Sequence, residues 1–182
     1  MPRFKKLLVL DLDETLVHAT EHKLGWEPDF KVFEYNIYKR PGLDKFLQQC
    51  LELFDVAVWT SSGEDYASQV VDVIFKDLGE IKIVLTSQHC VRRFDHDLGY
   101  FYNIKDLRKI KKKTGYALGS IIMVDDSKEK LERNYGNAVF VKEFIGQKDD
   151  DELIKLLKYL EVIGEVENVR KVDKLHWYKK IH

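Results

Sequence analysis

Two aspartates separated by one leucine stand at the end of an apolar run, in the segment Asp11-Leu12-Asp13-Glu14-Thr15. The run itself, Lys6–Asp11, is short and apolar, as in a strand that is buried on both faces. Ligands of open α/β sheets bind outside the carboxyl ends of the strands, so a turn here can aim Asp11 and Asp13 into one pocket. An acidic loop without a function remains the simpler interpretation of an isolated Asp-x-Asp pair.

Further polar residues follow other predicted strand ends or loop-to-helix junctions. In chain order they are Thr60, Lys105, Asp125, Asp126 and Ser127. Phosphoryl transfer requires such a set, because it needs a nucleophile, an acid for the leaving group, a cation that clamps the phosphoryl group and oxygen ligands for Mg²⁺. These residues therefore favour a phosphoryl-transfer site over a chance cluster of acids.

Strand-like and helix-like segments alternate along the chain, which is typical of an α/β fold with a parallel sheet. Apolar runs predict strands at Lys6–Asp11, Asp55–Trp59, Ile81–Leu85, Ser120–Val124 and Ala138–Val141. We find no internal repeat and no interdomain linker, so we expect residues 1–182 to form a single domain.

Helices are predicted between these strands. An apolar stripe at helical spacing runs from Leu43 to Phe54, and Pro41 fits the first turn of that helix. A second helix is expected to start near Ser62, with Asp65 three residues later as a weak capping-box signal. A third is expected over 153–160, because leucines recur there at helical spacing after an acidic start.

Two stretches depart from the alternation. His18–Lys39 is predicted to form a loop followed by a hairpin or flap, whose Trp26, Phe30 and Phe33 either form an apolar peptide pocket or pack the flap. Thr86–Asn103 is rich in histidine, arginine and aromatic residues and is predicted to add short strands on one rim.

The motifs together resemble a known family. DLDET, WTSS, a lone lysine and VDDS, in this order, resemble the four motifs of the haloacid-dehalogenase superfamily. LVLDLDETLVH, Lys39-Arg40-Pro41-Gly42, Val58-Trp59-Thr60-Ser61 and Asn103-Ile104-Lys105-Asp106-Leu107 resemble the small phosphatases of the RNA polymerase II C-terminal domain and their NLI-interacting-factor and Dullard relatives. The resemblance covers about residues 7–160 and leaves 161–182 as a C-terminal extension. It implies a three-layer, Rossmann-like fold with a mainly parallel sheet, a short β flap and no large cap domain.

The resemblance also implies the reaction and its main residues. Asp11 would attack phosphorus and form an aspartyl-phosphate, which divides hydrolysis into two easier steps. Asp13 would protonate the leaving oxygen and then activate water. Mg²⁺ would be held by Asp11, the backbone carbonyl of Asp13 and Asp125, and would relieve the repulsion between a carboxylate and a phosphate.

Other residues would support this chemistry. Thr60 would donate its hydroxyl to a phosphoryl oxygen, and Lys105 would neutralise charge on the nucleophile and the transferred group. Thr15 would hydrogen-bond the loop that carries the two aspartates, and Ser61 is placed in the same supporting group. Asp126 would orient a metal-bound water or the lysine, although ordinary helix capping is an alternative.

A short flap leaves an open site, which in this superfamily suggests a phosphoprotein or phosphopeptide substrate. Arg92, Arg93 and Tyr100 are candidates to receive a peptide, with a solvated rim as the alternative for each. Preference for phosphoserine and phosphothreonine over phosphotyrosine is left open. The alternatives are a phosphatase of small molecules or nucleic-acid ends, and a non-catalytic phosphoprotein-binding pseudophosphatase. A phospho-receiver domain is disfavoured, because there the second acidic pair would not follow the lysine.

Composition narrows the partners. Thirty basic and thirty-one acidic residues leave a net charge of −1 over 182 residues, which argues against direct nucleic-acid binding. Apolar runs are far shorter than the ~20 residues of a membrane span. Cys50 and Cys90 form no CxxC motif, and the N-terminus lacks the pattern of a secretory signal. We therefore expect an intracellular protein, in the cytoplasm or nucleus, with no membrane partner. The sequence leaves its oligomeric state open.

Overall fold

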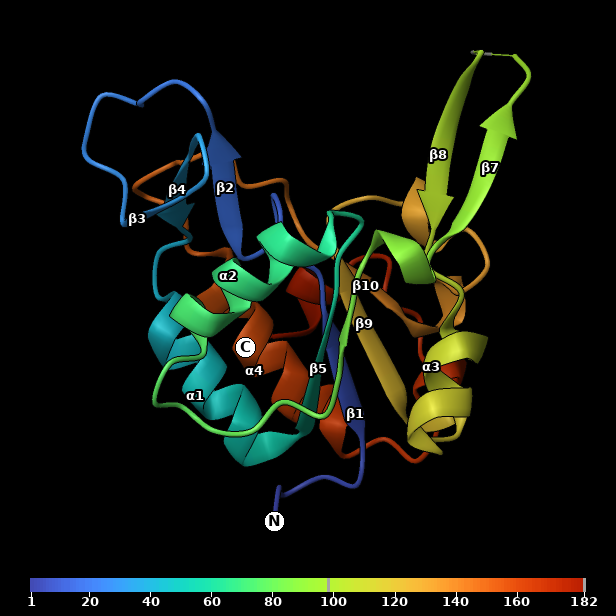
Figure 1. Ribbon diagram of the computed structural model, residues 1–182. Helices are drawn as coiled ribbons and strands as arrows, with labels where there is room; N and C mark the ends of the chain where they lie inside the picture. The colour runs from blue at the N-terminus through green and yellow to red at the C-terminus, as the bar shows by residue number, and fades with distance from the viewer. Residues whose placement is uncertain (98, 182) are drawn as a thin grey trace.

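The computed structural model describes residues 1–97 and 99–181. Its central sheet consists of β1 (Leu7–Leu10), β5 (Asp55–Trp59), β6 (Val84–Leu85), β9 (Ile121–Asp125) and β10 (Ala138–Phe140). These strands are parallel, in the order β10-β9-β1-β5-β6 (Figure 1). The carboxyl end of β1 therefore lies between those of β5 and β9, which is where such sheets bind ligands.

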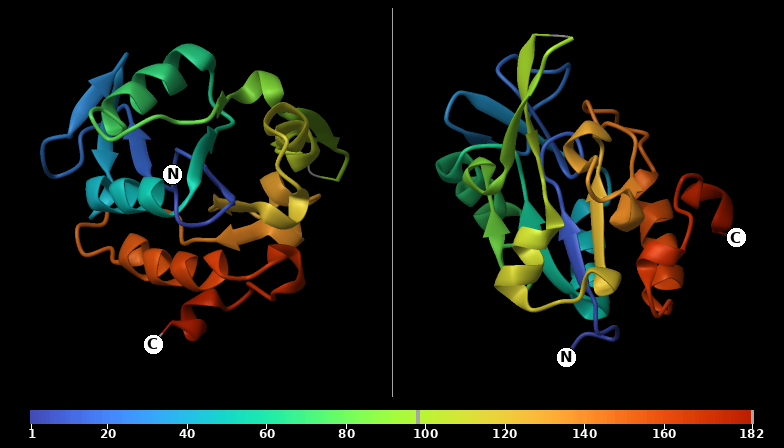
Figure 2. Two further views of the ribbon diagram at one scale, coloured as in Figure 1. Left: turned by 90° about the horizontal axis from the view of Figure 1, so that it is seen from below. Right: turned by 90° about the vertical axis from the view of Figure 1, so that its right-hand side faces the viewer.

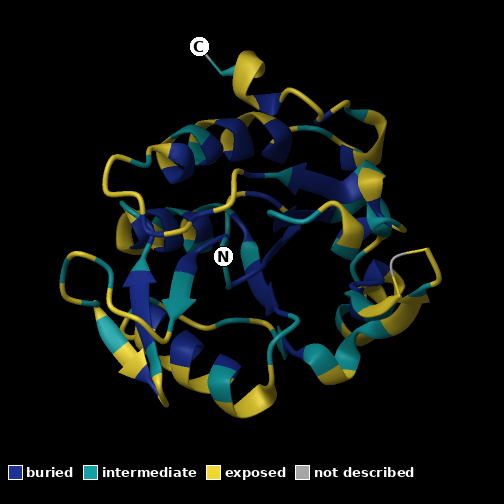
Figure 3. Cartoon of the chain, turned by 90° about the horizontal axis from the view of Figure 1, so that it is seen from above, coloured by how far each residue is buried: buried dark blue, intermediate teal, exposed yellow. Residues whose placement is uncertain are grey.

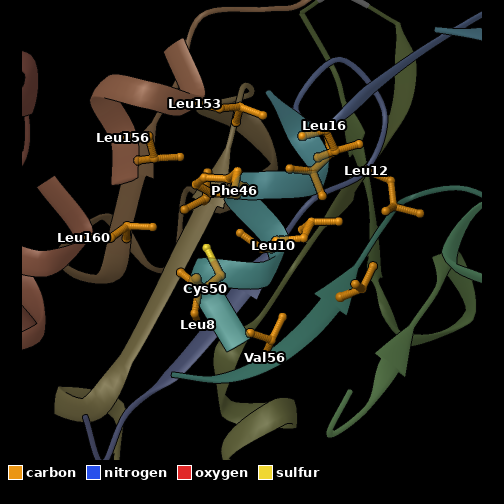
Figure 4. Packing of buried hydrophobic residues seen from close by; sticks show 14 of the residues in the cluster. Leu8, Leu10, Leu12, Leu16, Phe46, Cys50, Val56, Leu153, Leu156 and Leu160 are labelled. Carbon is orange, nitrogen blue, oxygen red and sulfur yellow. The ribbon is translucent and has the colours of Figure 1, made fainter. Parts of the chain in front are cut away.

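Helices cover both faces of this sheet. On one face lie α1 (Leu43–Leu53), α2 (Glu64–Ile74) and α4 (Glu152–Gly164), and on the other lies α3 (Leu107–Thr114). Because side chains alternate along a strand, Leu8 and Leu10 pack with α1 and α4 (Figure 4), whereas Leu7 and Val9 pack with α3. This arrangement confirms the predicted three-layer α/β fold.

Two small antiparallel sheets rise from the carboxyl end of the central sheet. The flap consists of β2 (Val17–Thr20), β3 (Phe30–Val32) and β4 (Tyr35–Lys39), and the hairpin consists of β7 (Val91–Asp95) and β8 (Tyr100–Ile104). They stand at opposite sides of the molecule, and their outer ends carry exposed residues (Figure 3). The hairpin was predicted as short strands and the flap as a loop followed by a hairpin or flap. The structure adds β2 to the flap as a third strand that pairs with β4.

Some predicted boundaries were wrong. Pro41 lies before α1 rather than in its first turn, because Gly42 adopts the left-handed φ of 79° that bends the chain into the helix. The capping box at Ser62 and Asp65 does not form among the described residues, since α2 starts at Glu64 and the Ser62 hydroxyl donates to Asp13 instead. The strand expected at 81–85 is reduced to the two residues of β6.

The C-terminal segment packs back onto the same structure. α4 continues to Gly164, beyond the end of the motif resemblance at Leu160, and the chain after it folds back beside this helix (Figure 2). Trp177 is buried against Tyr159, with ring centroids 5.6 Å apart. The Trp177 indole donates to the carbonyl of Phe140 at 2.7 Å, which ties the segment to β10.

Short 3₁₀ helices complete the described elements: η1 (Ser87–His89), η2 (Leu118–Ser120), η3 (Glu129–Leu131), η4 (Tyr135–Asn137), η5 (Val169–Lys171) and η6 (Trp177–Lys180). Within residues 1–97 and 99–181, no helix has the length and apolar character needed to cross a membrane.

Candidate active site

The turn after β1 places the two aspartates on the open side of the sheet. The Asp11 amide still donates to the carbonyl of Val124 in β9, at 3.0 Å. Leu12 and Leu16 are buried in the core (Figure 4), and the amide of Leu16 donates to the carbonyl of Leu12 at 2.8 Å. Because Leu12 points into the core, the aspartates on either side of it are directed away from the core.

Arg40, the residue after β4, holds this turn in place through hydrogen bonds. Its side chain is buried, and its guanidinium forms two hydrogen bonds of 2.8 Å to the carboxylate of Asp150, just before α4. The same group donates to the carbonyls of Thr15 and Lys142, each at 2.9 Å. Arginine suits this position because its planar fork can bind a carboxylate with two parallel hydrogen bonds.

Lys105, immediately after β8, lies fully buried between two carboxylates. Its Nζ is 2.6 Å from Asp11 Oδ1 and 2.6 Å from Asp125 Oδ2. Burial works to lower the pKa of Lys105, but the two carboxylates outweigh it and raise that pKa above its usual value. Burial likewise opposes ionisation of Asp11, yet Lys105 lowers its pKa, so the predicted nucleophile is held as a carboxylate.

Asp11, Asp125 and Asp126 bring carboxylate oxygens within 4.8 Å of one another. Burial and the nearby Asp11 raise the pKa of Asp125, so this group of negative charges calls for a cation. Carboxylate oxygens are hard ligands of the kind that Mg²⁺ prefers, so the residues fit this ion. The carboxylate of Asp13 is not part of this cluster.

Asp13 instead faces α2, where three hydroxyls meet its carboxylate. Ser62 Oγ donates to Asp13 Oδ2 at 2.6 Å, and Tyr66 Oη donates to Asp13 Oδ1 at 2.6 Å. Thr60 Oγ1 donates to Asp13 Oδ2 at 3.3 Å and accepts from the amide of Ser62 at 3.0 Å. In this structure the Thr60 hydroxyl, which the sequence assigned to a phosphoryl oxygen, donates to Asp13 instead, and Ser62 and Tyr66, which were not predicted, donate to the same carboxylate.

A pocket of about 400 Å³ opens beside Asp13, between the flap and α2. It is lined by Asp13, Glu14, Ala19, Tyr35, Ser62, Gly63 and Tyr66. Burial and the neighbouring carboxylates of Asp13 and Asp126 raise the pKa of Glu14 to about 7.

The aromatic residues predicted to shape a peptide pocket in the flap do not line this one. Phe33 is exposed at the flap turn, and Trp26 packs edge-on against Tyr38 with ring centroids 5.9 Å apart. Phe30 shares a face of the flap with Ala19 and Tyr35 but packs against the hydrophobic core. Ala19 and Tyr35 are the flap residues that line the pocket.

A second lysine enters the acidic cluster, and the sequence interpretation missed it. Lys130 Nζ lies 3.3 Å from Asp11 Oδ2 and 3.5 Å from Asp126 Oδ1. Burial works to lower the pKa of Lys130, but the carboxylates of Asp11, Asp125 and Asp126 outweigh it and raise that pKa. Lys130 therefore stays protonated. The available signal was its spacing of four residues after Asp126, which is easily taken for a surface ion pair.

The three residues predicted to support the site have different surroundings. The Thr15 amide donates to the carbonyl of Leu12 at 3.2 Å, but its hydroxyl is buried without a hydrogen-bond partner in the described chain. Asp126 lies by Lys130 rather than by Lys105. The hydroxyl that reaches Asp13 belongs to Ser62, the residue after Ser61.

The residues predicted to receive a peptide do not converge. Arg93 and Tyr100 share one side of the hairpin, where the Tyr100 hydroxyl donates to Glu129 at 2.8 Å. Arg92 is on the other side, with its guanidinium 4.1 Å from the centre of the Phe101 ring. There it lines a cavity of about 440 Å³ together with Ser87, Gln88, Cys90, Phe101 and Asn103.

Comparison with known proteins identifies the family of this chain. The family model of NLI interacting factor-like phosphatases matches residues 6–170. A probable C-terminal domain small phosphatase of Dictyostelium discoideum is 36% identical, over 92% of this chain and 53% of its own length. The CTD nuclear envelope phosphatase 1 of Xenopus tropicalis is 31% identical, over 92% of this chain and 71% of its own length.

A solved structure shares the fold. The fission yeast RNA polymerase II CTD phosphatase Fcp1, bound to beryllium fluoride, superposes with a TM-score of 0.58 at 17% identity, over 97% of this chain and 49% of that one. The chain thus spans about half the length of the Dictyostelium relative and of this structure. With a family match that covers most of its length, the chain belongs to the NLI interacting factor-like phosphatases.

Proposed function

We propose that this chain is a Mg²⁺-dependent phosphoprotein phosphatase that acts through an aspartyl-phosphate on Asp11. The proposal rests above all on Lys105, whose ammonium lies 2.6 Å from both Asp11 and Asp125 and keeps the nucleophile ionised. The family, whose named relatives are phosphatases, supports the same reaction class.

In the first step, a carboxylate oxygen of Asp11 forms a bond to phosphorus while the bond from phosphorus to the ester oxygen breaks. Asp13 gives its proton to that leaving oxygen. In the second step, Asp13 takes a proton from water, whose oxygen bonds to phosphorus as the bond from phosphorus to Asp11 breaks. Inorganic phosphate leaves, and both aspartates return to their starting forms.

The hydroxyls around Asp13 suit a group that alternates between acid and base. They donate to Asp13 when it is a carboxylate, as the bonds from Ser62 and Tyr66 show. When Asp13 carries a proton, a hydroxyl can rotate and accept it, because hydroxyls both donate and accept. Asp13 is therefore held in one orientation in both states.

The cation site is assigned to Asp11 and Asp125, with the backbone carbonyl of Asp13 as a further ligand and Asp126 near enough to orient bound water. When bound, Mg²⁺ supplies positive charge that offsets the repulsion between Asp11 and a phosphate ester. Thr60 and Lys105 are proposed to hold the transferred phosphoryl group. In that state the Thr60 hydroxyl leaves Asp13, to which its bond is the longest of the three.

A phosphoprotein is the proposed substrate because the pocket beside Asp13 is open between the flap and α2. The Dictyostelium relative is named a probable C-terminal domain small phosphatase, and the fission yeast structure is that of an RNA polymerase II CTD phosphatase. These names favour a protein substrate here. The proposal keeps the intracellular location expected from the sequence, in line with a relative named for the nuclear envelope.

The test is hydrolysis of peptides that carry phosphoserine, phosphothreonine or phosphotyrosine, with and without Mg²⁺. We expect phosphate release that requires Mg²⁺ and is lost in Asp11→Asn. Turnover of small phosphate esters together with failure on every phosphopeptide would favour the small-molecule alternative. Undiminished hydrolysis by Asp11→Asn would contradict the mechanism.

A further inference from the structure

Lys130 occupies the centre of the acidic cluster. Besides its contacts with Asp11 and Asp126, its Nζ lies 4.0 Å from Asp125 Oδ1. It therefore approaches each of the three carboxylates whose oxygens lie within 4.8 Å of one another. A single ammonium among three carboxylates stands where a divalent cation would be attracted by the same charges.

The two lysines divide the carboxylate oxygens between them. Lys105 takes Asp11 Oδ1 and Asp125 Oδ2, and its complete burial fixes it there. Lys130 lies beside the two oxygens that remain, Asp11 Oδ2 and Asp125 Oδ1. Since Lys105 blocks the first pair, a cation that binds both aspartates has to use the pair that Lys130 faces.

The Lys130 side chain can move out of the acidic cluster more easily than that of Lys105. Its side chain is 26% exposed, and its distances of 3.3 to 4.0 Å are longer than the 2.6 Å of Lys105. A lysine is a point charge on a flexible stem, so the ammonium can withdraw to solvent without moving the backbone.

We infer that Lys130 is a tethered competitor of the divalent cation: its ammonium offsets part of the negative charge of Asp11, Asp125 and Asp126 in the metal-free protein, and metal binding displaces it. The inference rests on the proposed function, because it assigns the cation to the same carboxylates. It makes the affinity for the metal lower than the carboxylates alone would provide, and so makes the site respond to the cation concentration around it.

The test is binding of Mn²⁺, a hard cation that can be followed by calorimetry and by the loss of its free electron paramagnetic resonance signal. We expect Lys130→Met to bind Mn²⁺ about tenfold more tightly than the unmodified chain, because the competing ion pairs are partly buried. Lys128→Met is the matched control, since it removes the same charge from an exposed side chain two residues away. It should leave the affinity within about twofold.

Lys130→Arg provides a second variant, because it keeps a cation over the carboxylates and guards against a folding defect in Lys130→Met. It should bind Mn²⁺ no more tightly than the unmodified chain. Equal or weaker binding by Lys130→Met would overturn the inference, while Mn²⁺ binding by the unmodified chain that is lost in Asp125→Asn would leave the proposed function intact. Failure of the unmodified chain to bind Mn²⁺ would overturn both.

Discussion

Tyr66 and Asp13 are joined by a hydrogen bond of 2.6 Å that links the first turns of α2 to the turn after β1. Tyr66 lies far from Asp13 in the sequence, and its hydroxyl approaches the oxygen that Ser62 and Thr60 leave free. The Asp13 carboxylate is therefore held on both oxygens, and its orientation depends on residues outside the acidic motif.

Removing the Tyr66 hydroxyl should impair the proton transfers assigned to Asp13. We expect Tyr66→Phe to lower kcat by about ten- to a hundredfold, the usual range for one hydrogen bond to a charged group. Steady-state kinetics on a phosphopeptide would measure this. Unchanged kcat would show that Asp13 is oriented without Tyr66.

The neighbouring serines offer a matched comparison. We expect Ser62→Ala to lower kcat by about tenfold, because its hydroxyl donates to Asp13 at 2.6 Å. Ser61→Ala removes the same hydroxyl one residue earlier and should have the smaller effect. Equal losses in the two variants, measured under the same conditions, would contradict the assignment of Ser62 over Ser61.

Substitution of Asp11 and substitution of Asp13 should block different steps of the reaction. Asp11→Asn should form no phosphoenzyme, because an amide cannot act as the nucleophile. Asp13→Asn should keep a nucleophile but slow turnover by at least about a hundredfold, since it can neither give nor take the proton. Rapid quench with a radiolabelled phosphopeptide, followed by acid precipitation, measures the protein-bound phosphate. Equal labelling of the two variants would contradict the division of roles.

Arg40 should matter to stability more than surface charges do. Arg40→Met leaves Asp150 and two backbone carbonyls without their donor in a buried position, so we expect a loss of about 3–5 kcal/mol in the free energy of unfolding. Lys39→Met breaks an ion pair with the exposed Asp44 and should cost less than about 1 kcal/mol. Denaturant unfolding compares the two, and similar losses would argue against a clamp at Arg40.

Ionisation of Asp106 should make the free energy of unfolding depend on pH in the acid range. Hydrogen bonds from Arg108 lower its pKa from 3.8 to about 2 against the effect of burial, so the folded state favours its ionised form. The stabilisation that ionised Asp106 provides is fully present above pH 3.8 and is lost as the pH falls towards 2. Because the Arg108 side chain is exposed and its charge is screened by water and salt, we expect Asp106 to contribute only about 1 kcal/mol to the free energy of unfolding.

The control for this prediction is Asp106→Asn, which can still cap α3 but carries no charge. Its unfolding free energy should fall less over the same acid range than that of the unmodified chain. Identical pH profiles for the two proteins, measured by denaturant unfolding, would refute the contribution of Asp106.

The central sheet was readily predicted because its strands are buried on both faces. Asp55–Trp59 matches β5 at both ends, and the apolar run before Asp11 contains β1. A strand buried in this way appears as a continuous apolar run, and parallel strands bring their carboxyl ends to one edge. The positions of Asp11 and Asp125 in a single site follow from that rule, whereas Lys105 reaches the site from the end of β8, outside the central sheet.

Residues that reach the site from polar segments were harder to find. Lys130 lies in η3 among other charged residues, and no period in the sequence separates an ammonium that turns inward from one in solvent. Arg92 and Arg93 are adjacent in the chain, yet strand alternation sends them to opposite sides of the hairpin. Ser62 and Tyr66 join the site only because α2 packs over the turn after β1.

The flap and the hairpin each begin and end on paired residues. Val17 at the start of the flap pairs with Lys39 at its end, and Val91 at the start of the hairpin pairs with Ile104 at its end. The flap and the hairpin therefore each join the rest of the chain through a pair of neighbouring residues, so insertions or substitutions at their outer ends need not disturb the central sheet. The outer ends of the flap and the hairpin are therefore where residues can change while Asp11, Lys105 and Asp125 stay in place.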